Sequence, residues 1–190
     1  DKGMPNLPCG FERVAKLFGG RIYQATPSRA PAMNFLARIG ELDPDRTNED
    51  FKDLFDICVD IIADMASEKN ETLSRIQRNE IIESLTESHY RYRHSERERE
   101  FLLRDVVKVL KEPPRPNETE DHFHMRQELA ILMREYYGDG TYARFFDRAG
   151  RLELKERFIV FDLKGLSRNP DLQRVFLKVA MIWADEVMNI

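Results

Sequence analysis

Apolar residues recur at helical spacing through the middle of the chain, and few folds can bury such a pattern. The segments that show it are residues 51–65, 73–92, 102–110 and 125–136. Each places apolar side chains at i, i+3 and i+4, the spacing of one buried helix face. Pro113 and Pro114 must end the third segment, because proline lacks an amide donor and clashes with the preceding turn. The pattern predicts a bundle of helices.

Polar residues ahead of two segments predict where those helices begin. Thr47 with Asp50 three residues on, or Asn48 itself, can accept hydrogen bonds from the first amides of one helix. Ser95 followed by Glu98 matches the capping box, in which two side chains satisfy each other's backbone amides. We therefore expect these residues to start the first and the third helix.

The two ends of the chain have the pattern of α/β structure. A helical stripe over residues 11–18 leads through a Gly-Gly pair into a short strand at residues 21–25. Near the other end, an apolar strand stops at Asp162 and residues 169–190 follow as an amphipathic helix. The predicted fold class is mainly α, with a helical bundle inserted between two short α/β fragments. The corresponding divisions are residues 1–46, 47–150 and 151–190.

Composition limits the classes of protein that this chain can belong to. It has 190 residues with a formal net charge of -4, which argues against a dedicated nucleic-acid binder. No run approaches the roughly 18 consecutive apolar residues of a membrane span, so we expect a soluble, cytoplasmic protein. Cys9 and Cys58 lack C-x-x-C spacing and predict reduced, structural thiols. Because the chain starts at Asp1 and its first Met is Met4, we expect an excised piece or a processed product.

No cluster of side chains predicts a catalytic, cofactor-binding or metal site. His122 and His124 are two residues apart and do not share a helix face, and metal sites usually need three or four ligands. His89 and His94 lack a Ser or Cys partner and are expected to be surface or half-buried residues. The glycine-containing segment 138–141 lacks the lysine and the spacing of a phosphate-binding loop, so it predicts a tight turn.

One segment mixes aromatic and cationic residues as single-strand nucleic-acid binders do. The candidate interaction residues are Tyr90, Arg91, Tyr92, Arg93 and Arg97. Glutamates at 96, 98 and 100 offset the positive field of these arginines and can pair with them along a helix. A solvated, salt-bridged face is therefore the preferred interpretation, and DNA binding remains an alternative.

The order of short motifs along the chain resembles one family of motors. These motifs are Gly19-Gly20, Ile22-Tyr23, Met33-Asn34-Phe35, Gly140-Thr-Tyr142-Ala-Arg-Phe145-Phe146 and Phe161-Asp-Leu163-Lys-Gly-Leu166. Together they are similar, in type and order, to the segment between the nucleotide motifs of type IV secretion and conjugation ATPases, the TraC-like and VirB-type family. The family's loop proline is absent beside Asn34.

This resemblance implies a RecA-like ATPase that powers pilus assembly or the transfer of DNA or protein. The ATP-binding lysine of the family would precede Asp1, and its Asp-Glu pair for magnesium would follow Ile190. ATP and magnesium would therefore belong to the parent protein, and this chain alone would be inactive. Asp162 would mark the end of a sheet strand and would not be a catalytic residue.

The same resemblance implies partners and a location. Other copies of the ATPase and secretion components at the bacterial inner membrane would bind the helical insert. A homodimer through the strand edges at Ile159–Phe161 is a further expectation, since unpaired edges invite pairing. The alternatives are a free-standing helical interaction module and a single-strand nucleic-acid binder.

Overall fold

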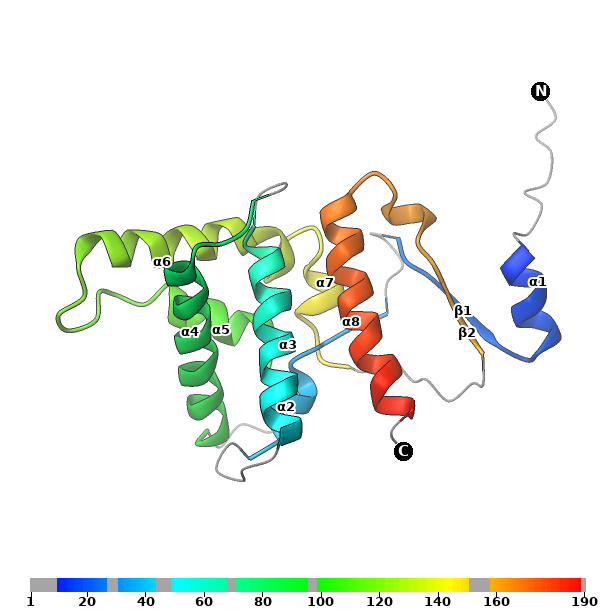
Figure 1. The fold of residues 1–190 in the computed structure, drawn as a ribbon, viewed down its shortest axis with the longest axis horizontal. Helices are drawn as coiled ribbons and strands as arrows, with labels where there is room; N and C mark the ends of the chain where they lie inside the picture. Colours follow the sequence, from blue (N-terminus) through cyan, green and yellow to red (C-terminus); the bar gives the residue numbers. More distant parts are fainter. Residues whose placement is uncertain are drawn as a thin grey trace.

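Helices make up most of the described structure (Figure 1). The computed structural model describes residues 10–26, 31–43, 49–67, 71–95, 99–150 and 158–188. In chain order the elements are α1 (Gly10–Leu17), β1 (Arg21–Gln24), α2 (Ala37–Glu41), α3 (Glu49–Met65), α4 (Arg75–Arg93), α5 (Leu103–Leu110), α6 (Glu120–Leu132), the 3-10 helix η1 (Met133–Tyr136), α7 (Ala143–Phe146), β2 (Ile159–Asp162), the 3-10 helix η2 (Lys164–Leu166) and α8 (Pro170–Met188). The predicted mainly helical class is confirmed.

The strands from the two ends of the chain pair with each other. β1 and β2 run parallel, in a register that aligns Arg21 with Ile159 and Gln24 with Asp162. Gly20 allows this approach, because a Cβ atom there would lie 2.4 Å from the carbonyl oxygen of Phe158. Parallel strands need a long crossover connection, and here α2 to α7 supply it.

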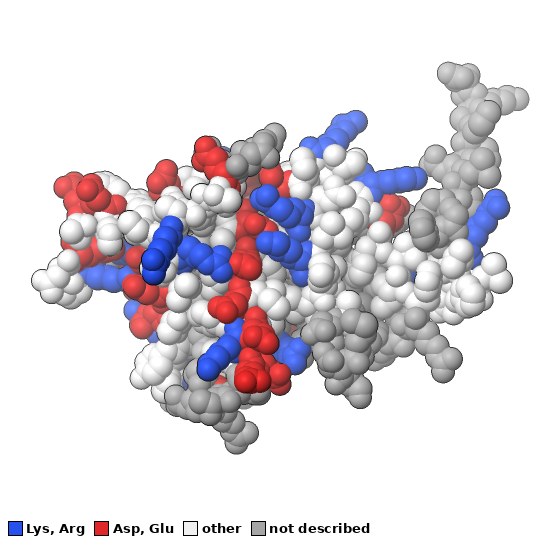
Figure 2. Space-filling model, viewed as in Figure 1, with Lys and Arg blue, Asp and Glu red and all other residues white. Residues whose placement is uncertain are grey.

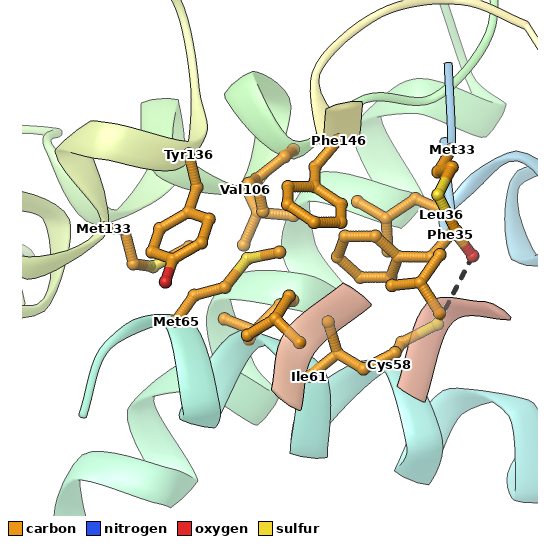
Figure 3. Packing of buried hydrophobic residues seen from close by; sticks show 14 of the residues in the cluster. Met33, Phe35, Leu36, Cys58, Ile61, Met65, Val106, Met133, Tyr136 and Phe146 are labelled. Atoms are coloured by element: carbon orange, nitrogen blue, oxygen red, sulfur yellow. Dashed lines mark hydrogen bonds between the residues drawn. The ribbon is translucent and has the colours of Figure 1, made fainter. Parts of the chain in front are cut away.

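The core lies where α3 packs against α4 and α8, with α3 and α8 running in opposite directions (Figure 1). Figure 3 shows Ile61 and Met65 of α3 facing Phe35, Tyr136 and other apolar side chains from loops and short helices. The buried thiol of Cys58 lies 3.7 Å from the carbonyl oxygen of Phe35, and burial raises its pKa. This thiol fills space in the core, as predicted, whereas Cys9 lies outside the described residues.

Of the two predicted helix starts, the one before α3 lies outside the described residues and the one before α5 is wrong. Thr47 and Asn48 lie outside the described residues. Ser95 does not start α5, because its hydroxyl donates to the carbonyl oxygen of Tyr92 at 2.7 Å and closes α4. The amide of Leu102, just before α5, donates instead to the carboxylate of Asp105 at 3.0 Å. The helix therefore begins eight residues after Ser95, at Leu103.

Two further expectations need correction. Pro31 and Gly40 predict loops on either side of residues 33–36, but Gly40 lies within the short helix α2, which begins at Ala37. His89, expected at the surface or half buried, is 3% exposed. Its Nε2 lies 2.8 Å from the carbonyl oxygen of Ile39, and its ring packs between Phe51 and Phe101. It is therefore part of the core.

Candidate interaction surfaces

Arg91 on α4 is held in place by two carboxylates. Its Nε lies 2.6 Å from the carboxylate of Glu87, one turn earlier. Its two terminal nitrogens both reach Glu112, just after α5, and one of these contacts is 3.0 Å long. These hydrogen bonds raise the pKa of Arg91 further above its ordinary value and lower that of Glu112. Its guanidinium links α4 to the end of α5. A phosphate could bind there only if the ion pairs of Arg91 with Glu87 and Glu112 were broken.

The remaining candidate residues do not converge on one surface. Tyr92 is half buried and donates its hydroxyl to the carbonyl oxygen of Arg99 at 2.8 Å. Tyr90 is 59% exposed, and its ring centre lies 4.1 Å from that of His94. Arg93 is exposed, and Arg97 lies outside the described residues. A stacking platform for bases needs its rings on one accessible face, and Tyr90 is the accessible ring here.

A shallow groove of about 210 Å³ separates α4 from α5 close to these residues. Its cationic lining consists of Arg91, Arg99 and Lys108. Arg99 is paired with Asp105 through both terminal nitrogens, one of them at 2.7 Å. Asp105 on the wall of the groove and the partners of Arg91 outside it therefore offset two of these cations, which leaves Lys108 as an exposed cation there.

The loop between α5 and α6 is organised by a buried arginine that sequence reasoning missed. Arg126 is 0% exposed and donates to Glu118 at 2.8 and 2.9 Å. It also donates to the carbonyl oxygens of Val109 and Leu110, both at 2.9 Å, and to that of Pro113 at 3.2 Å. The hydrogen bond from Arg126 lowers the pKa of Glu118 to about 2. One side chain thus satisfies the C-terminal carbonyls of α5.

A second buried charge, Asp147, holds the start of α5 and the predicted glycine turn. Its carboxylate accepts from the backbone amide of Arg104 at 2.9 Å and from the side-chain Nε at 3.0 Å. It also accepts from the amide of Gly138 at 2.8 Å. The tight turn predicted at residues 138–141 is confirmed by the backbone bond from Gly140 to Tyr137. Because the Gly138 amide is already bonded, this turn does not fit a phosphate.

Asp162 at the end of β2 forms a local turn. Its carboxylate accepts from the backbone amide of Lys164 at 3.0 Å. Among the described residues, no group of three His, Cys, Asp or Glu side chains could hold a metal ion. Asp162 therefore has a structural contact at the end of β2, and we assign it no step in nucleotide chemistry.

The exposed face formed by α3 and α8 combines carboxylates with apolar side chains. Figure 2 shows a column of acidic residues along α3, and beside it an uncharged surface over α8. The apolar side chains on this face are Ile57, which is 42% exposed, Leu177, which is 44% exposed, and Met181, which is 70% exposed. The sequence contained this signal as acidic residues three or four apart in residues 49–64, but it was not recognised as a surface.

No helix within the described ranges has the length and apolar character needed to cross a membrane. No protein-family model matches the chain, and no curated protein or solved structure matches it significantly.

Proposed function

We propose that this chain is a segment of a type IV secretion or conjugation ATPase, in which it supplies a helical interaction subdomain inserted into a RecA-like sheet. The observation that carries the proposal is the parallel pairing of β1 with β2. Three of the motifs that resemble the family lie on or beside these two strands, namely Gly19-Gly20, Ile22-Tyr23 and the segment 161–166. A helical body that leaves one strand and returns to its parallel neighbour has the connectivity of an insertion into an α/β sheet.

Helix packing around the strand pair adds support. Because neighbouring residues of a strand point to opposite faces, Phe158 and Phe161 belong to opposite sides of β2. Phe18, after α1, contacts Phe158 with ring centres 6.2 Å apart, and Phe176 of α8 contacts Phe161 at 5.8 Å. Helices on both faces of parallel strands are typical of α/β sheets.

The strand pair also lacks the neighbours that such a sheet would have. Within the described residues the sheet contains two strands, and a sheet this small is marginal in water. Near it, Leu17 is 83% exposed and Phe18 is 71% exposed. Further strands and helices of a motor would cover these surfaces. The proposed divisions at residues 1–46, 47–150 and 151–190 follow from this view.

In the whole motor, ATP hydrolysis would drive pilus assembly or transfer, and the helices of this segment would contact other secretion components. The sequence of this chain contains no phosphate-binding loop, so the isolated chain is expected to show no ATP turnover. The first test is to read the gene on both sides of this segment and to express the complete product. We expect a phosphate-binding loop before the segment and an Asp-Glu strand after it.

The complete product should hydrolyse ATP, and replacing its phosphate-binding lysine by alanine should abolish turnover. The same alanine variant should fail to restore transfer in a strain that lacks the gene. A reading frame without either nucleotide motif would refute the proposal. Turnover by the purified 190-residue chain, retained after removal of contaminating ATPases, would refute it equally.

A further inference from the structure

The acidic column on α3 is paired at one end and open at the other. Its members are Glu49, Asp53, Asp56, Asp60 and Asp64, which are three or four residues apart and so share one side of the helix. Asp60 lies 2.6 Å from Arg78 of α4, and Asp64 lies 2.5 Å from Lys178 of α8. Glu49, Asp53 and Asp56 have no ion-pair partner among the described residues.

The helix dipole accounts for only part of this open end. Glu49 lies in the first turn of α3, where a negative charge is favourable. Asp56 lies two turns into the helix, beyond the reach of that effect. Like charges three or four residues apart also repel each other. In the isolated chain, repulsion between the unpaired carboxylates therefore slightly lowers the stability of α3, and a cationic partner would remove this repulsion.

Apolar side chains border the same end of the face. Ile57 lies two turns before Asp64, on the side of α3 that meets α8. Met181 lies one turn beyond Lys178, the residue that pairs with Asp64. Because α3 and α8 run in opposite directions, both steps lead toward the same end of the face (Figure 1). In Figure 2, basic side chains lie between much of the acidic column and the uncharged surface over α8.

We infer that the face formed by α3 and α8 binds a basic amphipathic helix of a protein partner. The apolar side of that helix covers Ile57, Leu177 and Met181, and its lysines or arginines pair with Asp53 and Asp56. Charge complementarity selects this occupant, because an acidic segment would be repelled and a purely apolar one would leave the carboxylates unpaired. The inference rests on the proposed function and deepens it, since it assigns the contact with other components to one surface.

A synthetic 18-residue peptide tests this binding on the whole chain. It carries leucines on one helical face and lysines on the other, with a fluorescent label, and binding is followed by fluorescence anisotropy at low and high salt. A peptide of the same composition in scrambled order is the first control. We expect the amphipathic peptide to bind more tightly than the scrambled one, with an affinity that falls as salt rises.

Variants locate the site on the chain. The double change Asp53→Asn and Asp56→Asn should weaken binding by roughly fivefold to tenfold at low salt, because exposed ion pairs contribute modestly. Met181→Ser should weaken binding at both salt concentrations. The matched control is Asp121→Asn with Glu128→Gln on α6, which removes the same charge from exposed positions and should leave binding unchanged. Circular dichroism establishes that each variant keeps its helices.

Three results would overturn the inference. They are equal binding of the scrambled peptide, equal weakening by the α6 control, and self-association of the chain through this face. Each concerns peptide binding and none requires ATP, so failure here is distinguishable from failure of the motor proposal. If the gene lacks nucleotide motifs while the peptide binds as described, the binding surface on α3 and α8 is supported and the proposal of a motor segment is refuted.

Discussion

At the scale of single residues, Arg126 is the side chain on which the loop after α5 most depends. Its guanidinium has five hydrogen bonds and no exposure to solvent. Such a residue looks like an ordinary surface cation in a sequence, because its partners lie 8 to 17 residues earlier, at the end of α5 and in the irregular loop that follows it. Prediction of this network would require the positions of Glu118 and the α5 carbonyls in advance.

Replacing Arg126 by methionine should be strongly destabilising. The change leaves Glu118 buried without its partner and strips donors from the carbonyls of Val109 and Leu110. Breaking a buried ion pair from one side typically costs about 3–5 kcal/mol of the free energy of unfolding. Urea denaturation measures this cost. Arg134→Met is the control, because that side chain is 73% exposed and its loss should cost less than about 0.5 kcal/mol. Equal effects of the two changes would contradict the structural role of Arg126.

His89 should make stability depend on pH. Burial lowers its pKa below the ordinary value of 6.5, so the folded protein favours the neutral ring. Between the two pKa values the unfolded chain binds more protons, and stability therefore falls as pH decreases below about 6.5. Phe51 and Phe101 face the ring. Arg93 opposes its protonation, whereas Asp43 and the carbonyl oxygen of Ile39 favour it, and burial outweighs both.

The test compares the free energy of unfolding at pH 7.5 and pH 5.5, two conditions on either side of the ordinary histidine pKa. His89→Gln can keep a donor toward Ile39 but does not titrate, so the loss of stability at the lower pH should become smaller. His124→Gln, at an exposed position, should behave as the unchanged protein does. An unchanged pH dependence in His89→Gln would rule out this histidine as the cause.

At the scale of elements, the sequence predicted those helices and strands whose pattern is local. The stripes of α3, α4 and α8 and the short strands β1 and β2 lie close to their expected positions. The predicted start of α5 at Ser95 was wrong. One contact that fixes the actual start is distant in the sequence, because the Arg104 amide donates to Asp147, which lies more than 40 residues later. The short helix α2 was missed because five residues are too few to show helical periodicity. Burial of His89 also depends on Phe51, from another helix.

The first turn of α4 should be sensitive to one hydroxyl. Ser74 accepts from the amide of Gln77 at 3.3 Å, and the side chain of Gln77 accepts from the amide of Ser74 at 2.9 Å. Because both residues lie outside the core, Ser74→Ala should cost about 1 kcal/mol through the helix cap alone. Thermal and urea unfolding measure this loss. Thr86→Ala, inside the same helix, should cost nearly nothing, because its hydroxyl bonds back to the Ile82 carbonyl. Similar costs at both positions would argue against a cap at Ser74.

At the scale of the whole molecule, the contact between β1 and β2 holds the two ends of the chain together. Gly20→Ala should loosen it, because the new Cβ would meet the Phe158 carbonyl at 2.4 Å. Hydrogen exchange should become faster at residues 21–24 and 159–162 and stay unchanged in α5. Gly19→Ala is the neighbouring control, since a Cβ there meets nothing within 4 Å and its cost is conformational strain at φ 65°.

Gly20→Ala should therefore disturb the strands more than Gly19→Ala does. If exchange in α5 rises as much as exchange in the strands, the strand pair and the helices unfold as one unit. Unchanged exchange in β1 and β2 would mean that the backbone near Phe158 accommodates the methyl group.

The pairing of β1 with β2 also affects how the protein is made. During synthesis α1 and β1 leave the ribosome before α2 to α7, and they remain without Ile159–Asp162 while those helices are produced. The helices α3, α4 and α5 can close contacts with each other during this time, because helix packing between near neighbours is fast. The sheet forms last, and until then the edge of β1 is open to other nascent chains. Slow or interrupted translation near the end of this segment would therefore prolong the time during which the unpaired edge of β1 is exposed.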